Sequence, residues 1–403
     1  MEERVGNSSH KVRTGVVASV MAVCVVGLVT LGSADRVSDS HGPTASELQT
    51  ALAASVRFSP SPGSKNVPPD ARIAVASELG RLARVRVRST DGTFVNGRWD
   101  PATGQWKSHG VLAYDTVYHV TATVTGASHL LAQTTTAFRT LAPTNRVSAS
   151  VFPTDGMTVG VGQPIVFTFS QPVAPEARAA LAGHIIVKAA GAPVVGGWHW
   201  FNDHELHFRP KAFWPQGRQV TVLWALNGWN AGGEAWGEGV GVSRFTIGDA
   251  HVSIANLATF QMAVTDNGRV VATYPISGGK PTDPTMGGTH IVLDRASVVR
   301  MNSATNGVPV NSADGYDELV YDDVHISDSG EYVHAAPWSV NNQGNANVSH
   351  GCINLSPADA KAFFDFSRIG DVVMVTGGPR PPDFGDHGVM DWSSDWTEYT
   401  PTP

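Results

Sequence analysis

The sequence predicts a mainly β protein, in which two tandem immunoglobulin-like β-sandwiches precede a third β-rich domain. Glycine (42) and proline (25) are about one in six of the 403 residues, which favours many turns and short strands over long helices. Short runs such as 83–88 and 121–124 alternate apolar and polar residues, as half-buried strands do. Two stretches of similar length, 57–146 and 147–249, also match each other in layout, which indicates a tandem repeat.

The first segment of the chain predicts export across a membrane. Residues 14–34 carry no charge and are long enough to span a bilayer. Lys11 and Arg13 precede this run, so the positive-inside rule places residues 1–13 in the cytoplasm. We interpret 14–34 as a transmembrane signal anchor, and the alternative is a secretory signal that is cleaved after Ala34.

Residues 35–56 predict a linker, since they are polar and rich in Ser, Thr and Gly. From residue 57 onward we expect the chain to lie outside the cytoplasm. The chain has only two cysteines, Cys24 and Cys352, which excludes a disulfide framework and a cysteine-rich zinc module. Cys352 is therefore the only thiol of the exported part, and it has no partner there for an intramolecular disulfide.

The two repeats share short motifs at matching places. Residues 96–99 (Asn-Gly-Arg-Trp) correspond to 196–198 (Gly-Gly-Trp), and residues 118–121 correspond to 218–221. Because neither repeat contains a cysteine pair, we predict that apolar packing stabilises both cores. Tryptophans are the largest candidates for these cores, with a sugar-binding surface as their alternative role: Trp99, Trp106, Trp198, Trp200, Trp214 and Trp224.

The third domain is expected to span residues 250–376, with strand-like runs at its beginning and its end. Its clearest helix covers 356–366, which begins with a serine cap followed by a proline. Residues 301–323 are rich in Asn, Ser and Gly without clear periodicity, and such a segment in a compact domain indicates a functional loop such as a lid. The tail, 377–403, contains two tryptophans, and we expect it to pack back on the domain.

The charge and the histidines argue against two further kinds of site. A net charge of −7 argues against a nucleic-acid partner, because such partners are bound by neutralising phosphates. His199, His204 and His207 lie close in the sequence, but His204 and His207 would face opposite sides of a strand. We therefore expect no metal site and no cofactor. Acidic pairs such as Asp322 and Asp323 are expected to be solvated.

The neighbours of Cys352 predict a reactive thiol. A thiol at its ordinary pKa is mostly protonated at neutral pH, and it needs a nearby imidazole to become a useful thiolate nucleophile. His350 lies two residues before Cys352, so on an extended chain both side chains face the same way. His334 can reach the thiol only through folding. Gly351 permits close backbone approach, and the amides around it are candidates for an oxyanion hole.

The motif Ser-His-Gly-Cys-Ile-Asn at 349–354, with His334 upstream, resembles the catalytic domain of the L,D-transpeptidases, the YkuD-type domain. The layout of anchor, two immunoglobulin-like domains, catalytic domain and tryptophan-bearing tail resembles the larger mycobacterial and related actinobacterial enzymes of this family. The resemblance implies that the third domain is an L,D-transpeptidase β-sandwich with short helices, and that the enzyme acts on peptidoglycan in the cell wall space.

The resemblance also implies a role for each residue of the motif. Cys352 would be the nucleophile and His334 the general base, although His350 is an alternative base. His350 and Gly351 would otherwise shape the catalytic loop and its oxyanion donors. The remaining residues would bind substrate, line the cleft and its lid, or orient the catalytic groups, as Ala335 would through its backbone carbonyl: Tyr316, Met301, Trp338, Ser349, Asn354 and Ala335.

The reaction implied by the resemblance is the 3→3 cross-linking of peptidoglycan stem peptides. Cys352 would attack the carbonyl between meso-diaminopimelate and the terminal D-Ala of a tetrapeptide stem, form a thioester and release D-Ala. The side-chain amine of a second diaminopimelate would then take the acyl group. Carbapenem-type β-lactams would acylate the same thiol as covalent inhibitors. The alternatives that share this chemistry are L,D-carboxypeptidase activity, with water as acceptor, and attachment of proteins to the wall.

Two functions from other classes compete with this interpretation. A papain-like cysteine protease would place its cysteine before its histidine, whereas His334 precedes Cys352 here. A catalytically inactive wall-binding protein built from sandwich domains would not need the cysteine.

Overall fold

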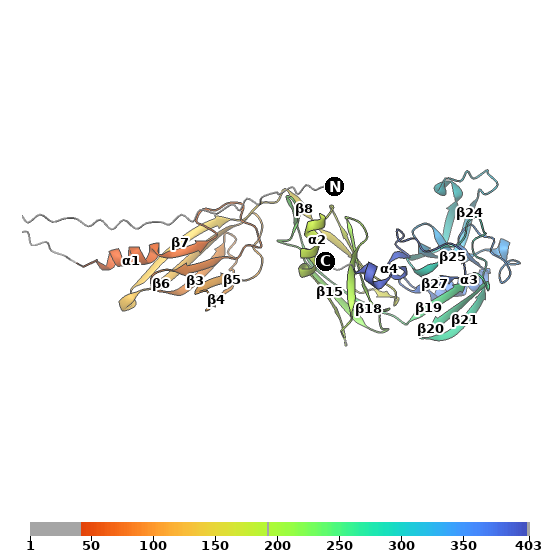
Figure 1. The fold of residues 1–403 in the computed structure, drawn as a ribbon, viewed down its shortest axis with the longest axis horizontal. Coiled ribbons are helices and arrows are strands. Elements are labelled where there is room, and N and C mark those ends of the chain that lie inside the picture. The colour runs from red at the N-terminus through yellow and green to blue at the C-terminus, as the bar shows by residue number, and fades with distance from the viewer. Residues whose placement is uncertain (1–41, 192, 401–403) are drawn as a thin grey trace, which may run out of the picture. The chain divides into compact units, whose positions relative to one another are not determined.

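The computed structural model describes residues 42–191 and 193–400, and Figure 1 shows its helices and strands. The predicted cytoplasmic segment 1–13 and the predicted membrane anchor 14–34 lie outside the described residues. None of the helices in the described part is long and apolar enough to span a membrane. The fold is mainly β, as the sequence predicts, and its strands form three sandwiches, which we name first, second and third in chain order.

The first sandwich is preceded by a helix that the sequence does not predict. Helix α1 (Ala45–Ala54) lies in the stretch 35–56, which we expected to be a linker. Thr44 and Glu47 form a reciprocal cap, in which each side chain accepts a hydrogen bond from the other residue's backbone N–H (2.7 and 3.2 Å). Leu52 is buried in the core of the first sandwich. This cap and the packing of Leu52 and Ala53 against the core stabilise a helix in a segment whose composition indicated a linker.

The first sandwich packs a four-stranded sheet against a three-stranded one. The four-stranded sheet has the order β1-β2-β5-β4, with β1 (Val56–Ser59), β2 (Ala74–Ser77), β5 (Gln105–Ser108) and β4 (Gly97–Asp100). The other sheet has the order β3-β6-β7, with β3 (Arg81–Ser89), β6 (Val117–Thr125) and β7 (Leu131–Arg139). The alternating runs at 83–88 and 121–124 therefore form strands, as predicted.

The second sandwich consists of two four-stranded sheets and a small three-stranded one. One sheet contains β10 (Thr158–Val159), β18 (Val240–Ile247), β15 (Gln219–Ala225) and β12 (Ile185–Ala189) in this order. The facing sheet contains β13 (Gly196–Trp200), β14 (Glu205–Pro210), β11 (Ile165–Phe169) and β9 (Ala149–Phe152). The small sheet joins β16 (Asn230–Gly232), β17 (Ala235–Gly237) and β8 (Asn145–Val147), and helix α2 (Pro175–Leu181) packs nearby.

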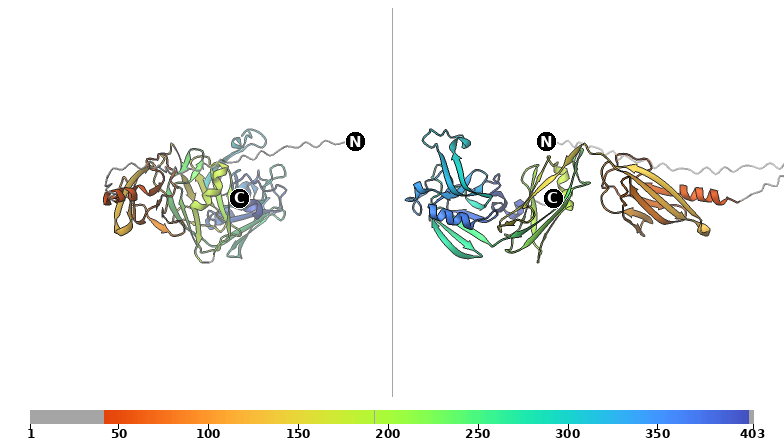
Figure 2. Two further views of the ribbon diagram at one scale, coloured as in Figure 1. Left: turned by 60° about the vertical axis from the view of Figure 1, so that its left-hand side comes forward. Right: turned by 180° about the vertical axis from the view of Figure 1, so that it is seen from behind.

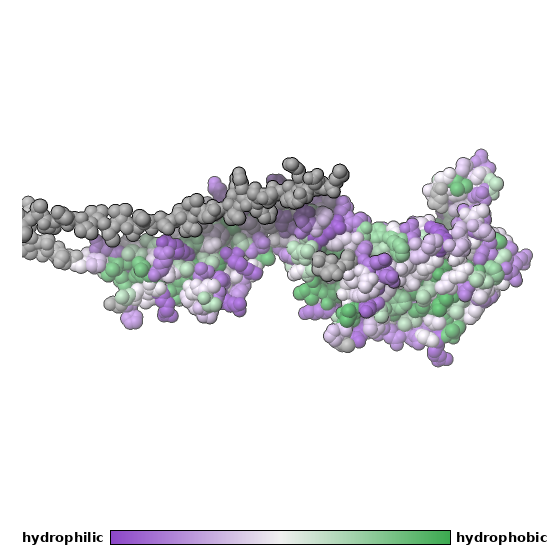
Figure 3. Space-filling model, in the orientation of Figure 1, coloured by the Kyte–Doolittle hydropathy of each residue, from purple (hydrophilic) through white to green (hydrophobic). Residues whose placement is uncertain are grey.

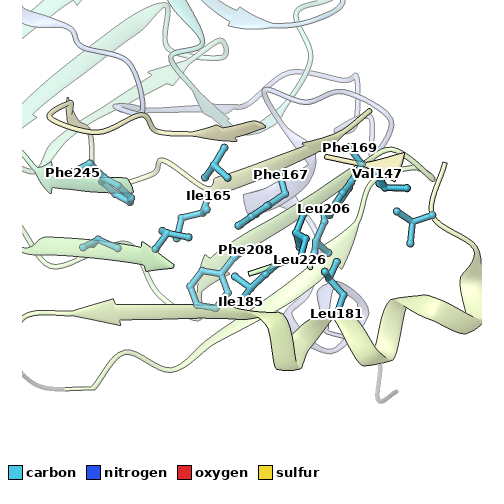
Figure 4. Packing of buried hydrophobic residues seen from close by; sticks show 14 of the residues in the cluster. Val147, Ile165, Phe167, Phe169, Leu181, Ile185, Leu206, Phe208, Leu226 and Phe245 are labelled. Atoms are coloured by element: carbon cyan, nitrogen blue, oxygen red, sulfur yellow. The ribbon is translucent and has the colours of Figure 1, made fainter. Parts of the chain in front are cut away.

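The core of the second sandwich is aromatic and aliphatic, as the repeat analysis predicts. Figure 4 shows Phe167 and Phe208 among side chains that project into one layer from several strands. Trp214 is fully buried, and its indole N–H donates to the Gln163 carbonyl oxygen at 2.7 Å. Trp198, Trp200 and Trp224 pack against this core while they are only partly buried.

The prediction of a buried tryptophan is wrong for Trp99. Its side chain remains 47% exposed, because β4 is the edge strand of its sheet and Trp99 has only Trp106 directly across from it. Trp106 packs partly buried against the core of the first sandwich. An aromatic residue at an edge therefore gains contact on one side only.

The third sandwich packs a five-stranded sheet against a four-stranded one. The five-stranded sheet contains β21 (Arg269–Pro275), β20 (Gln261–Asp266), β19 (His251–Asn256), β27 (Val372–Thr376) and β22 (Gly288–Ile291) in this order. The other sheet contains β23 (Asp294–Asn302), β24 (Asp317–Ser327), β25 (Glu331–Ala335) and β26 (Ile353–Leu355). Polar and apolar side chains are mixed on the surface that Figure 3 shows.

The predicted helix of the third sandwich is present as α3 (Pro357–Phe366). The Ser356 hydroxyl accepts a hydrogen bond from the Asp359 backbone N–H at 3.1 Å, which caps its first turn. Ala360 and Phe363 of this helix are buried in the core of the third sandwich. Figure 2 shows α3 in blue beside the strands of this sandwich. A local signal in the sequence therefore places this helix correctly.

The predicted lid is shorter than the stretch 301–323 suggested. Strand β23 extends to Asn302 and β24 begins at Asp317, so these two strands form a long hairpin with 303–316 as its connection. This hairpin stands out from the body of the third sandwich in Figure 1. The Asn- and Ser-rich residues remain in the connection, whereas residues 301–302 and 317–323 pair across the hairpin, which satisfies their backbone hydrogen bonds.

The tail packs back as predicted, but it contacts the second sandwich as well as the third. It contains two short helices, α4 (Met390–Ser393) and α5 (Trp396–Tyr399). Ser393 accepts a hydrogen bond from the Thr289 backbone of β22 at 2.9 Å. On the other side, the Trp392 indole N–H donates to the Gly162 carbonyl oxygen at 2.6 Å. The Arg209 guanidinium lies over the rings of Trp392, Trp396 and Tyr399.

Candidate active site

A pocket of about 490 Å³ in the third sandwich brings together most of the residues that the sequence singles out. It lies between the long hairpin, the turn that joins β24 to β25, and the segment before β26. The predicted site residues that line it are Met301, Tyr316, His334, Trp338, Ser349, His350, Cys352 and Asn354. Ala335 and Gly351 do not line it but support residues that do.

The parallel pairing of β25 with β26 places the thiol beside the histidine strand. His334 lies opposite Asn354 in this register, and Cys352 immediately precedes β26. Cys352 therefore lies near Tyr332, whose backbone N–H forms a hydrogen bond with the thiol. The Cys352 Sγ atom also lies 3.9 Å from the carbonyl oxygen of Gly330, in the turn before β25. Two segments distant in sequence thus meet because of strand order.

The His334 imidazole is held in one tautomer. Its Nδ1 atom lies 3.0 Å from the carbonyl oxygen of Ala335, and a carbonyl can only accept, so Nδ1 carries the proton. Nε2 is then left with a lone pair that can accept a proton. The ring is buried, with 3% of the residue exposed, and burial lowers the pKa of His334 to about 4. The imidazole is therefore neutral near neutral pH.

The thiol is also neutral in the resting site. Burial, with a smaller contribution from the nearby carboxyl groups of Glu331 and Asp323, raises the pKa of Cys352 to about 12, although the Tyr332 backbone hydrogen bond lowers it. We expected an imidazole to hold this sulfur as a thiolate. The structure instead favours a neutral thiol and a neutral imidazole, because burial disfavours the charged form of both. The proton must then leave the sulfur during attack on a bound substrate.

Ser349 and Gly351 fix the loop that carries Cys352. The Ser349 hydroxyl donates to the Cys352 carbonyl oxygen at 2.6 Å and accepts from the Gly351 backbone N–H at 3.2 Å. Gly351 has φ 128°, a backbone conformation that side chains other than glycine rarely adopt. Because the Gly351 N–H is engaged with Ser349, it is not a free oxyanion donor in this state. The Asn354 side-chain amide donates a hydrogen bond to the Ser339 hydroxyl at 3.0 Å, which fixes the chain two residues after Cys352.

His350 faces the hairpin connection and belongs to the rim of the pocket. Its ring centroid lies 5.2 Å from that of Tyr316, and its Nε2 atom lies 4.0 Å from an Asp314 carboxylate oxygen. Its side chain is 40% exposed, against 3% for the residue His334. Trp338 lies on another side, with its ring centroid 6.1 Å from that of His334. The buried, tautomer-locked His334 is thus the better placed of the two histidines to act as a base.

Comparison with known proteins identifies the family. L,D-transpeptidase 2 of Mycobacterium tuberculosis is 36% identical over 396 residues, an alignment that covers 96% of this chain and 94% of that relative. The chain belongs to the L,D-transpeptidase family. The family model of the L,D-transpeptidase catalytic domain matches residues 250–375, and the model of a bacterial Ig domain matches residues 64–230. The enzyme class and the fold class predicted from the sequence are thereby confirmed.

Two further L,D-transpeptidases are similar to this chain. L,D-transpeptidase 5 of Mycobacterium tuberculosis is 29% identical over 409 residues, which covers 97% of this chain and 86% of the relative. The solved structure of the L,D-transpeptidase LdtMt1 in complex with imipenem is 37% identical, with a TM-score of 0.51. That match covers 58% of this chain and all of the other chain.

Two buried carboxyl groups of this L,D-transpeptidase were missed by the sequence analysis. Asp323, expected to be solvated, is fully buried, and within the described residues neither carboxylate oxygen has a hydrogen-bond partner. Burial raises its pKa to about 7, as it does for Glu331. Glu331 accepts hydrogen bonds from the Met286 backbone N–H (3.0 Å) and the Arg380 guanidinium (2.9 Å). The bulge at Asp322 breaks the alternation of inward and outward side chains along β24, and no sequence pattern predicts this bulge.

Proposed function

We propose that this L,D-transpeptidase forms 3→3 cross-links between meso-diaminopimelate residues of peptidoglycan, through a thioester on Cys352. The observation that supports this most is that Cys352 lines the same pocket as His334, whose Nδ1 is hydrogen-bonded to the Ala335 carbonyl, so that Nε2 is the basic atom. Both groups open into one pocket, which is large enough for a peptide stem. The proposed roles are nucleophile for Cys352 and general base for His334.

The first half-reaction transfers the donor acyl group to sulfur. The Cys352 thiol attacks the carbonyl between diaminopimelate and D-Ala as His334 Nε2 takes the thiol proton. The C–N bond to D-Ala then breaks, and the imidazolium returns that proton to the leaving amine. The proposed oxyanion donors are the Cys352 N–H and the Tyr332 N–H, which the sulfur releases when it bonds to the carbonyl carbon. Each donor of this kind supplies about 3–4 kcal/mol elsewhere.

The second half-reaction transfers the acyl group to an amine. The side-chain amine of a second diaminopimelate attacks the thioester carbonyl while His334 Nε2 accepts its proton. The C–S bond breaks, and the proton restores the neutral Cys352 thiol. Water as acceptor would hydrolyse the same thioester. We propose that the hairpin connection 303–316, with Tyr316 beside His350, limits the access of water during this step.

The test is incubation of the full chain with a disaccharide-tetrapeptide, followed by mass spectrometry of products and protein. We expect a dimer whose mass equals two substrates minus one D-Ala, and a protein adduct that is absent from Cys352→Ser. Free tripeptide without dimer would indicate carboxypeptidase activity instead. A protein that forms neither adduct nor product, while it remains folded, would contradict the proposal.

We propose further that Cys352 is acylated by carbapenems and that the chain works outside the cytoplasm. The first proposal is supported by the relative whose structure contains imipenem. The second is supported by the uncharged run 14–34, which serves either as an anchor or as a cleaved signal. Fractionation of cells that express the full chain distinguishes these cases, because only the anchored protein stays with the membrane after a salt wash.

A further inference from the structure

A second group of converging polar side chains lies where the tail meets the second sandwich. Glu205 and His207 come from β14, and His387 comes from the tail before α4. The Nε2 atom of His207 lies 2.6 Å from the Oε1 atom of Glu205, and the Nε2 atom of His387 lies 3.1 Å from the same oxygen. All three donor atoms lie within 4.8 Å of one another. Two imidazole nitrogens are therefore aimed at one carboxylate oxygen.

The other nitrogen of each ring is held by a separate carboxylate. His207 Nδ1 lies 2.9 Å from the Oδ2 atom of Asp391, and Asp391 also accepts a hydrogen bond from the Tyr399 hydroxyl at 2.9 Å. His387 Nδ1 is hydrogen-bonded to Asp328. Each imidazole thus directs Nε2 toward the centre and Nδ1 toward an outer carboxylate. This is the arrangement that fixes the tautomer and orientation of histidines that bind metal ions.

The surroundings hold the rings in place while leaving one side open. The side chain of His207 is 2% exposed, that of Glu205 17% and that of His387 31%. The Phe201 ring lies against both imidazoles, with centroid distances of 3.9 Å to His387 and 5.7 Å to His207. An ion would reach the cluster from the His387 side, where water can also complete its coordination.

We propose that Glu205, His207 and His387 form a binding site for a divalent metal ion of the zinc class. Two imidazoles and one carboxylate, with a position left for water, are a ligand set that suits Zn²⁺. Without the ion, the Nε2 atoms of His207 and His387 each direct an N–H at Oε1 of Glu205. These two protons leave to solvent when the Nε2 lone pairs bind the ion. One divalent cation then replaces two protons, so the charge of the cluster is unchanged.

Such an ion would connect the second sandwich to the pocket of the third. Asp328, the outer carboxylate of His387, lies in the turn between β24 and β25. Gly330 belongs to the same turn, and its carbonyl oxygen faces the Cys352 thiol. The tail also contacts this turn through Asp386, whose carboxylate accepts a hydrogen bond from the Ser329 backbone N–H at 2.9 Å. An ion at the proposed site would therefore stabilise the contacts of the tail with the second sandwich and with the turn between β24 and β25. This inference does not depend on the reaction proposed above.

The test is calorimetric titration of the full chain with Zn²⁺ after treatment with a chelator, in a Cys352→Ser background that removes the exported thiol. We expect one ion per chain bound at this cluster and a higher unfolding temperature with the ion present. His387→Gln can keep a hydrogen bond to Glu205 but is a poor ligand, and we expect it to lose this binding. Asp328→Asn, which changes only the outer carboxylate, should weaken binding by about 10–100-fold.

His204→Ala is the matched control, since His204 lies just before β14 as an exposed imidazole paired with Asp203 at 2.7 Å. It should bind Zn²⁺ like the parent. In addition, Co²⁺ should give visible absorption bands typical of nitrogen and oxygen ligands, and His387→Gln should abolish them. The proposal is overturned if the parent binds no ion, or if His387→Gln binds as tightly as His204→Ala while both unfold cooperatively without metal.

Discussion

The second and third sandwiches use the same architecture but fill it differently. Between its sheets the second sandwich buries large apolar rings, such as Phe167, which contacts Trp198 and Trp224 edge to face. Across β24, β25 and β26 of its four-stranded sheet, the third sandwich buries polar groups instead, among them Asp323, His334 and Asn354. The comparison teaches that the apolar rings stabilise the second sandwich, whereas burial in the third sandwich favours the neutral forms of His334 and Asp323.

The largest effect is expected from His334, the buried residue that we propose as the general base. His334→Gln should slow acylation of Cys352 by about 10²–10⁴-fold, since the thiol loses its proton acceptor. His350→Gln is the matched control and should cost about tenfold or less, because that ring lies exposed at the rim. Rates of adduct formation with a carbapenem, followed by intact mass, measure both. A greater loss for His350→Gln would exchange the two roles.

The next largest effect concerns the stability of the second sandwich. Phe167→Ala should lower the free energy of unfolding by about 3–5 kcal/mol, because it leaves a cavity at a fully buried position. Urea denaturation measures this loss, and the folded fraction should still be acylated at the parent rate. Phe94→Ala, at a ring that is 58% exposed, should cost far less. Equal losses for the two variants would mean that burial does not distinguish them.

Replacement of Asp323 is expected to have a smaller effect, which is a gain in stability rather than a loss. Its pKa is raised from 3.8 to about 7 by burial, so its contribution to stability is complete below pH 3.8 and is lost as the pH rises through 7. Asp323→Asn should therefore be more stable than the parent above neutral pH, by roughly 2–4 kcal/mol, and nearly equal to it in acid. Denaturation at several pH values measures this, and Asp322→Asn, which removes only the lesser cause of the raised pKa, should change the stability much less. A parent whose stability is flat through pH 7 would contradict the raised pKa.

The fold was predictable where the signal is local, and the site was predictable only in part. Ser356 caps the predicted helix, and the motif around Cys352 supplies four residues that line the pocket, whereas strand pairing brings the others there. The exposure of Trp99 depends on which strand forms the edge of a sheet, which no local pattern gives. The burial of Asp323 depends on a bulge. The meeting of His207 with His387 depends on the docking of the tail, which periodicity does not describe.

The smallest effect is expected at Ala335, which supports His334 only through its backbone. Ala335→Ser keeps the carbonyl that accepts from His334 Nδ1, so acylation should stay within about twofold of the parent rate. The same acylation assay measures it. A loss as large as that of His334→Gln would show that the side chain at 335, and not the backbone carbonyl, controls the imidazole.

The pH dependence of Cys352 acylation by a carbapenem tests the central claim most directly. A neutral thiol paired with a neutral imidazole predicts a rate that is level across the neutral range. It should fall only as the pH approaches about 4, where His334 becomes protonated. A rate that instead rises with pH around the ordinary thiol pKa, about 8.5, would mean that a free thiolate attacks without the base. The absence of any adduct on Cys352 would contradict the account altogether.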